Sequence, residues 1–217
     1  MAIPSKEKRH GVRPRDAASL ILYRREGRGS ILLGRRPEKA AFAPGVYVFP
    51  GGRLARSDFA CAPSRPLSRA TAETLSAHGA ARGRRASAFA NAAIRETAEE
   101  TGLAVGGAAP DHAALSFLGR AITPPDAPIR FHARFFMAPE GAATGAIRSN
   151  GELTEIGYYP LDEALRLPIF DVTEFMLTVV RGALAAGRIE APVLWSYRRG
   201  QPLPRKPMPA ALVQALA

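Results

Sequence analysis

Three acidic residues follow a helical spacing within residues 95–103, and this run constrains the fold more than any other part of the 217-residue chain. Glu96, Glu99 and Glu100 stand at positions i, i+3 and i+4, which places their carboxylates within roughly 100° of arc on one helix face. Like charges at this spacing destabilise a helix unless a counter-charge offsets them. Oxygen-only ligands favour a hard cation, so we expect a Mg²⁺ or Mn²⁺ site, with a solvated acidic face as the alternative.

The acidic run, read together with the Phe-Pro-Gly-Gly segment at residues 49–52, resembles the signature of the Nudix hydrolases. That signature is a glycine, five residues, a glutamate, seven residues, and then Arg-Glu-apolar-X-Glu-Glu-X-Gly-apolar. Residues 95–103 fit its second half, with Thr97 as a departure from an apolar position. Gly102 suits the position just beyond a helix C-terminus.

An insertion splits the signature. Counted from Gly52, its arginine belongs at position 66 but stands at Arg95, so 29 residues are inserted. Ser87 stands where the first glutamate falls when counted back from Arg95, and we expect it to cap the start of the helix. The inserted residues 53–86 read as loop around a short helix at 71–81. They adjoin the metal helix, and we hypothesise that they form part of a substrate lid.

The hydrophobic pattern predicts strands interrupted by one central helix and closed by a C-terminal helix. Strands are expected at residues 17–23, 30–34, 46–49, 115–122, 129–137 and 153–159, and helices at 87–101, 161–165 and 172–186. This order suggests an α/β/α sandwich around a mixed sheet, in agreement with the fold that the Nudix resemblance implies. We expect a basic mobile arm at residues 1–16, a Nudix domain at 17–187, and a Pro- and Arg-rich tail at 188–217 that packs on the domain.

Composition narrows the setting. Cys61 is the only cysteine, which fits a reducing compartment, and the chain has neither a run of 18 apolar residues nor a signal-like N-terminus, so we expect a cytoplasmic protein without membrane contact. The net charge of +11 fits a nucleic-acid or a phosphorylated small-molecule partner, or a composition bias toward arginine. The basic segments lack interleaved aromatics, which argues against nucleic acid. Nudix enzymes often dimerise, so a homodimer is an alternative to a monomer.

The resemblance implies hydrolysis of a pyrophosphate that joins a nucleoside to another group, X. Divalent metals neutralise phosphate charge and lower the pKa of water in such reactions. The expected metal ligands are Glu96, Glu99, Glu100 and the backbone carbonyl of Gly51. Arg95 is expected to clamp a glutamate of the signature with its planar fork, the alternative being a surface arginine.

The general base is left open between two sources. In this family it can be a glutamate of the signature, such as Glu96 or Glu99, or a glutamate from a loop opposite the helix. Glu152, at a loop-to-strand junction, is the first choice in that loop, and Glu155 is the second. An exposed carboxylate at a strand edge is the alternative interpretation of either residue.

Substrate choice rests on similarity to the branch of the family in which an insertion splits the signature, a branch that includes peroxisomal coenzyme A diphosphatases of mammals. The resemblance implies cleavage of coenzyme A or acyl-coenzyme A to 3′,5′-ADP and a phosphopantetheine. The alternatives are ADP-ribose, NADH or an oxidised nucleotide as substrate, or a catalytically weak Nudix-fold module that binds nucleic acid. Arg35, Arg36, Arg130 and Arg134 are the candidate phosphate ligands, although solvated strand arginines would look the same. Phe131, Phe135 and Tyr159 would stack on adenine or pack in the core, and His132 reads as a polar face residue.

Overall fold

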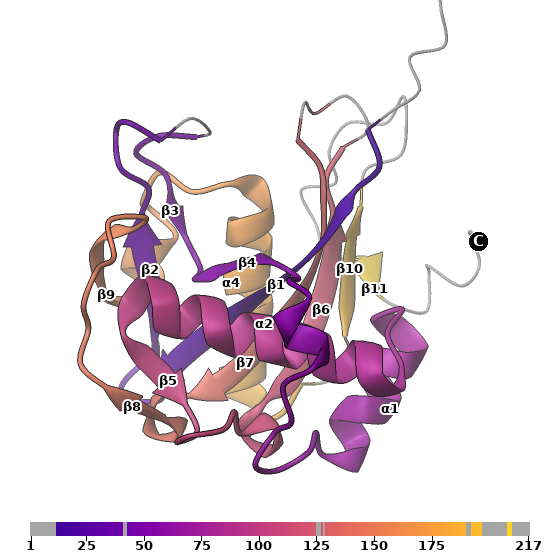
Figure 1. Cartoon of the computed structure of the whole chain (residues 1–217). Helices are drawn as coiled ribbons and strands as arrows, with labels where there is room; N and C mark the ends of the chain where they lie inside the picture. Colours follow the sequence, from indigo (N-terminus) through magenta and orange to yellow (C-terminus); the bar gives the residue numbers. More distant parts are fainter. Residues whose placement is uncertain are drawn as a thin grey trace, which may run out of the picture.

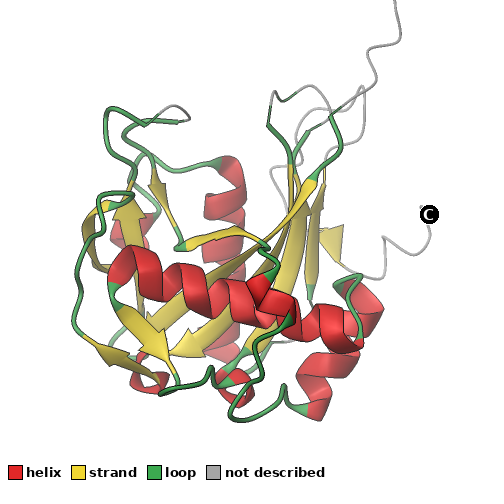
Figure 2. Ribbon diagram, viewed as in Figure 1, coloured by secondary structure: helices red, strands yellow, loops and turns green. Residues whose placement is uncertain are grey.

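A computed structural model describes residues 12–40, 43–124, 127, 129–189, 192–196 and 208–209. In these residues a twisted sheet lies between helices on both faces (Figure 1, Figure 2). The strands are β1 (Arg15–Arg24), β2 (Ser30–Arg35), β3 (Tyr47–Val48), β4 (Gly51–Arg53), β5 (Leu103–Val105), β6 (Ser116–Ile122), β7 (Phe131–Pro139), β8 (Ala143–Gly145), β9 (Thr154–Pro160), β10 (Val193–Ser196) and β11 (Met208–Pro209). The helices are α1 (Arg69–His78), α2 (Gly83–Thr101), α3 (Leu161–Ala164) and α4 (Asp171–Ala186), with 3-10 turns η1 (Ser57–Phe59), η2 (His112–Ala114) and η3 (Glu140–Ala142).

The main sheet is mixed. Its strands follow the order β11-β10-β6-β7-β1-β2-β3, with β9 paired to β2, and β5 and β8 form a separate antiparallel pair. Strand β1 runs parallel to β7 on one edge, while its other edge is shared between two partners. The first half of that edge pairs with β4 (Ala17 opposite Arg53), and the end pairs with β2 (Tyr23 opposite Ile31). The fold class predicted from the sequence is confirmed.

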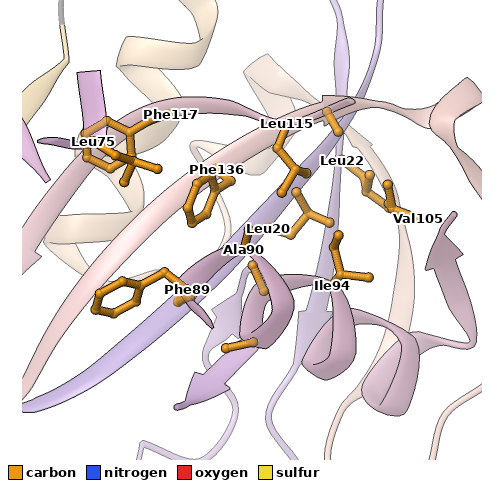
Figure 3. Close-up of a cluster of buried hydrophobic side chains, with 14 of the residues drawn as sticks. Leu20, Leu22, Leu75, Phe89, Ala90, Ile94, Val105, Leu115, Phe117 and Phe136 are labelled. Carbon is orange, nitrogen blue, oxygen red and sulfur yellow. The ribbon is translucent and has the colours of Figure 1, made fainter. Parts of the chain in front are cut away.

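Two hydrophobic cores flank the sheet because side chains alternate between its faces. Leu20 and Leu22 of β1 point toward α2, where they meet Phe89 and Ile94 (Figure 3). Ile21 points to the other face and belongs to the core beneath α4. Helix α2 therefore covers one face of the sheet and α4 covers the opposite one, as Figure 1 shows.

Both helices end where the sequence predicts. Gly102 follows α2 with a φ of 75°, and Gly187 follows α4 with a φ of 70°. A left-handed conformation at this position costs least for glycine, which has no Cβ. Glu100 therefore lies in the last turn of α2, and the chain turns at Gly102 into β5.

The start of α2 differs from the prediction. The helix begins at Gly83 rather than at Ser87, and its N-cap is Arg82, which makes no side-chain capping bond. Ser87 lies inside the helix, so its expected capping role is wrong. The inserted segment continues directly into the helix, and tertiary packing of Ala86 and Phe89 stabilises the additional turn.

The other predicted elements are present with shifted ends. The insertion helix runs from Arg69 to His78 and is capped by Ser68, whose Oγ accepts a hydrogen bond from the Thr71 amide. Residues 1–11 of the predicted arm and most of the predicted tail lie outside the described residues. Across the described part of the chain, no helix combines the length and the hydropathy needed to cross a membrane.

Candidate active site

The Phe-Pro-Gly-Gly turn brings backbone against the acidic face of α2. Gly51 and Gly52 open β4, which pairs with β1 directly beside the helix. A Cβ on Gly52 would collide with the carboxylate of Glu96, and a Cβ on Gly51 would collide with Ser19 and the Ala18 carbonyl. At Gly51 the obstacles include backbone atoms, so only glycine permits this approach, whereas at Gly52 the end of the Glu96 side chain would have to move.

Glu100 is fixed from the same turn. The Gly51 amide donates a hydrogen bond of 2.9 Å to its carboxylate. The carboxylate is buried, and burial raises the pKa of Glu100 to about 8, partly opposed by this hydrogen bond and by the positive charge of Arg36. Glu100 is thus a buried acid that lacks a strong cationic partner within hydrogen-bond range among the described residues.

Arg95 joins the acidic face to the insertion. Its Nη1 donates to Glu96 at 2.9 Å and to Glu99 at 3.0 Å. Its Nε and Nη2 form a two-point pair with the carboxylate of Asp58 at 2.9 and 3.1 Å, and Nη2 also donates to the Arg53 carbonyl. These contacts have the planar-fork geometry expected of Arg95, and its role in holding metal-binding carboxylates stays a prediction.

Asp58 is a residue that the sequence analysis missed. Counted forward from Gly52, the first glutamate of the family pattern falls at Asp58, whereas counting back from Arg95 leads to Ser87. The side chain is 2% exposed and pairs with Arg95, so the insertion splits the signature after Asp58 and not before it. Forward counting from the glycine was the signal that would have found it.

A buried amide holds Asp58 in place. Both hydrogens of the Asn91 side-chain amide donate to backbone carbonyls, one to that of Asp58 at 2.8 Å and the other to that of Cys61 at 2.9 Å. Its oxygen lies 2.7 Å from Nε2 of His112, which is fully buried. Because both amide hydrogens are used, the atom that faces His112 is the amide oxygen, which can only accept. His112 must therefore carry its proton on Nε2, and this assigns its tautomer. Burial lowers the pKa of His112 to about 4, which keeps the ring neutral.

The insertion packs into the core. Leu75 of α1 is fully buried in the cluster beneath α2, and the Thr71 hydroxyl donates to the Leu115 carbonyl at 3.0 Å. Of residues 53–86, all of which the structure describes, only Arg53 lines the pocket of the sheet that is described below. The hypothesis that this segment forms part of a substrate lid remains a prediction, but these contacts show that its helix is packed into the hydrophobic core.

The donor set fits a hard divalent cation. Its side-chain donors are carboxylate oxygens, and burial raises the pKa of Glu96 as well as that of Glu100, so a bound cation would favour the charged forms of both. Within the described residues, no three acidic, histidine or cysteine side chains yet surround a single point. Glu96 and Glu99 turn toward Arg95 instead, and Glu100 turns toward Gly51.

The two candidate bases have different surroundings. Glu152 is exposed on the loop before β9, and its charge raises the pKa of both Glu96 and Glu100, which places it near the acidic face. Glu155 is held by other groups, since it accepts hydrogen bonds from the Tyr47 hydroxyl and from Arg35. These bonds lower the pKa of Glu155.

A pocket of about 680 Å³ opens on the α4 face of the sheet and shares the glycine turn as one wall. Its floor consists of small residues on adjacent strands, Ala17, Ala121 and Ala133. Aromatic and cationic side chains surround this floor, namely Phe131, Phe135, Phe170, Arg15, Arg36 and Arg53. The pocket thus joins an apolar floor to a positively charged rim beside Gly51 and Gly52.

The structure separates the four predicted phosphate arginines. Arg36 lines the pocket, and its positive charge lowers the pKa of Glu100. Arg35 pairs with Glu38 and Glu155, and Arg130 donates to the carbonyls of Thr123 and Val12.

Arg134 lies on the opposite face of the sheet. It is 1% exposed, pairs with Asp16 at 2.7 Å, and its guanidinium carbon lies 4.0 Å from the centre of the Phe89 ring. Burial lowers its pKa to about 10. His132 shares this face and contacts Arg120 at 3.0 Å, as expected of a polar face residue. The pocket is lined by Arg15 and Arg53 instead, and neither lies in a motif of the sequence.

Comparison with known proteins identifies the fold. The sequence matches no protein-family model and no curated protein. A NUDIX hydrolase from Alicyclobacillus acidocaldarius is 26% identical, with a TM-score of 0.64 over 80% of this chain and 96% of that one. A MutT protein from Bacillus halodurans is 15% identical, with a TM-score of 0.50 over 88% of this chain and 94% of that one. The NUDIX domain of Shewanella oneidensis NrtR, solved with ADP-ribose, is 14% identical, with a TM-score of 0.50 over 81% and 90%.

The second and third likenesses concern the fold alone, while the first also extends to sequence. The chain therefore shares its fold with the NUDIX hydrolase from Alicyclobacillus acidocaldarius, and the acidic face of α2 against the glycine turn agrees with the family resemblance of its sequence.

Proposed function

We propose that the protein hydrolyses a pyrophosphate bond in a nucleoside diphosphate linked to another group, and that it requires Mg²⁺ or Mn²⁺. One observation carries this proposal. The Gly51–Gly52 turn touches Glu96 and Glu100 on one side and lines a pocket of about 680 Å³ on the other. A nucleoside in the pocket would therefore hold its phosphates beside the acidic face of α2.

Glu96, Glu99 and Glu100 would hold the metal, with the Gly51 carbonyl as a further ligand. A divalent cation there neutralises charge on the phosphoryl oxygens and lowers the pKa of water. Arg95 keeps the carboxylates in place through its bonds to Glu96 and Glu99. Removing Arg95 would free two of the three acidic side chains at once.

Glu152 is the proposed general base. It would accept a proton from water as the water oxygen bonds to phosphorus, while the bridging P–O bond breaks and its electron pair leaves with the departing phosphate. Its exposed position near Glu96 and Glu100 supports this role. Glu155 is the weaker candidate because Tyr47 and Arg35 already bind its carboxylate.

Coenzyme A or acyl-coenzyme A is the proposed substrate, giving 3′,5′-ADP and a phosphopantetheine. The positive rim of the pocket supports a substrate with several phosphates, and Arg36 is the best placed of the arginines proposed from the sequence. ADP-ribose and NADH are the alternatives that share the same chemistry. The proposed cytoplasmic location and a homodimer remain predictions, the second of which gel filtration with light scattering would test.

The test is incubation of the purified protein with Mg²⁺ and, separately, coenzyme A, ADP-ribose and NADH, with products identified by mass. Glu100→Gln should abolish cleavage, and Glu26→Gln, an exposed change in the turn between β1 and β2, should leave it intact. Release of 3′,5′-ADP would support coenzyme A as the substrate. Cleavage of only ADP-ribose or NADH would keep the proposed reaction and assign it to that substrate instead. Equal activity of the wild type and Glu100→Gln would contradict the proposed site.

A further inference from the structure

Two arginines stand side by side on the wall of the pocket. In the pairing of β1 with β4, Ala17 lies opposite Arg53, and residues directly opposite each other share a face of the sheet. Arg15 precedes Ala17 by two residues and therefore shares that face as well. Arg15 and Arg53 are diagonal neighbours, a relation that places Cα atoms about 7–8 Å apart. Both residues line the pocket.

No carboxylate among the described residues pairs with either of these two guanidinium groups. Asp16, the acid next to Arg15, points to the opposite face of β1, where it pairs with Arg134 and Arg85. Among the described residues, the one acidic member of the pocket lining is Asp171, whose carboxylate accepts a hydrogen bond from the Val172 amide at the start of α4. Like charges at neighbouring strand positions are unfavourable, so this pair of cations suits an anion placed between them.

Arg36 and the Arg15–Arg53 pair are separate positive charges on the pocket lining, and Arg53 directly follows the glycine turn. Arg36 is close enough to Glu100 to lower its pKa and so belongs to the end where the pyrophosphate would react. Arg15 lies opposite Phe131 in the pairing of β1 with β7, beside the aromatic part of the lining. A substrate whose pyrophosphate lies near Arg36 would need a second anionic group to engage Arg15 and Arg53 as well.

We propose that Arg15 and Arg53 bind a phosphate monoester on the nucleoside, so that the enzyme selects a substrate whose ribose carries an additional phosphate. The proposal rests on the proposed function and deepens it. A guanidinium binds a phosphate dianion with two parallel hydrogen bonds, and two such groups can hold one phosphate between them. A 3′-phosphoadenosine diphosphate derivative such as coenzyme A, or a 2′-phosphorylated dinucleotide such as NADPH, has this chemistry. ADP-ribose and NADH lack it.

The experiment uses pairs of substrates that differ only in this phosphate. Steady-state kcat/KM is measured with Mg²⁺ for coenzyme A against 3′-dephospho-coenzyme A, and for NADPH against NADH. The wild type should prefer the phosphorylated member of at least one pair by about ten- to hundredfold. Arg15→Met and Arg53→Met should each reduce that preference by at least about fivefold, mainly through KM, because they remove a charge-assisted bond to one substrate only.

Arg188→Met is the matched control. It removes the same charge from an exposed position just beyond the C-terminal end of α4, while the pocket contacts the N-terminal end of this 16-residue helix, about 24 Å away. This variant should keep the wild-type preference. Equal use of both members of each pair by the wild type, or an equal loss for both members in Arg15→Met and Arg53→Met, would overturn the clamp while leaving the hydrolase intact. Hydrolysis of none of the four substrates would instead count against the proposed function.

Discussion

Removing the carboxylate of Asp58 should destabilise the fold and disable the catalytic helix together. Asp58 is 2% exposed and forms two hydrogen bonds with Arg95, whose side chain is 26% exposed. Breaking a buried ion pair by deleting one partner costs about 3–5 kcal/mol. Water can still reach Arg95, so we expect the lower end of this range for Asp58→Ala, about 3 kcal/mol. In a domain of this size that corresponds to a fall in Tm of about 6–12 °C.

The assay combines thermal unfolding with kinetics. Asp162→Ala is the control, because Asp162 forms an exposed pair with Arg28, and such pairs contribute about 1 kcal/mol or less. At temperatures below the unfolding midpoint, Asp58→Ala should also have a lower kcat than the wild type, with a smaller change in KM. The reason is that Arg95 is no longer held in place, so the carboxylates of α2 lose its support. A loss of stability no larger than that of Asp162→Ala would refute the role assigned to the Asp58–Arg95 pair.

Three further outcomes are expected. Gly52→Ala should lower kcat at least about tenfold with little change in secondary structure by circular dichroism, because the new Cβ would displace the Glu96 carboxylate. Glu152→Gln should lower kcat about 100-fold or more, whereas Glu155→Gln should mainly lower Tm; the reverse pattern would exchange their roles. The folded-state pKa of His112 is about 4 against 6.5 when unfolded, so the unfolded chain binds more protons in this window and stability should fall as the pH drops from 6.5 to 4, by about 3 kcal/mol. Urea unfolding at several pH values should show that the free energy of unfolding depends less steeply on pH in His112→Gln than in the wild type. An unchanged pH dependence would show that this histidine does not titrate as described.

The sequence was sufficient where local rules act along a short stretch. The spacing of Glu96, Glu99 and Glu100 follows from the 3.6-residue helical repeat, and Gly102 ends the helix because it tolerates a positive φ. Alternating apolar residues located most of the main-sheet strands, including β1 and β7. These features depend on neighbours within a few positions.

Short or edge elements escaped prediction. The β5–β8 pair joins Leu103 to Gly145 across a long stretch of chain, and neither three-residue strand has a pattern of its own. The start of α2 at Gly83 has no capping signal in the sequence either, because packing of the insertion against the core sets this boundary. Tertiary context overrides local propensity at such positions.

The sequence by itself determined the family resemblance, the acidic helix and the glycine turn, since each is a matter of residue type and spacing. Only the tertiary structure decided which charges meet. It paired Asp58 with Arg95 across the insertion, buried Arg134 against Phe89, and placed Arg15 beside Arg53 on the pocket wall. An arginine in a sequence has the same charge at every position, but its role depends on the partner that the fold brings within about 4 Å and on how much water remains there.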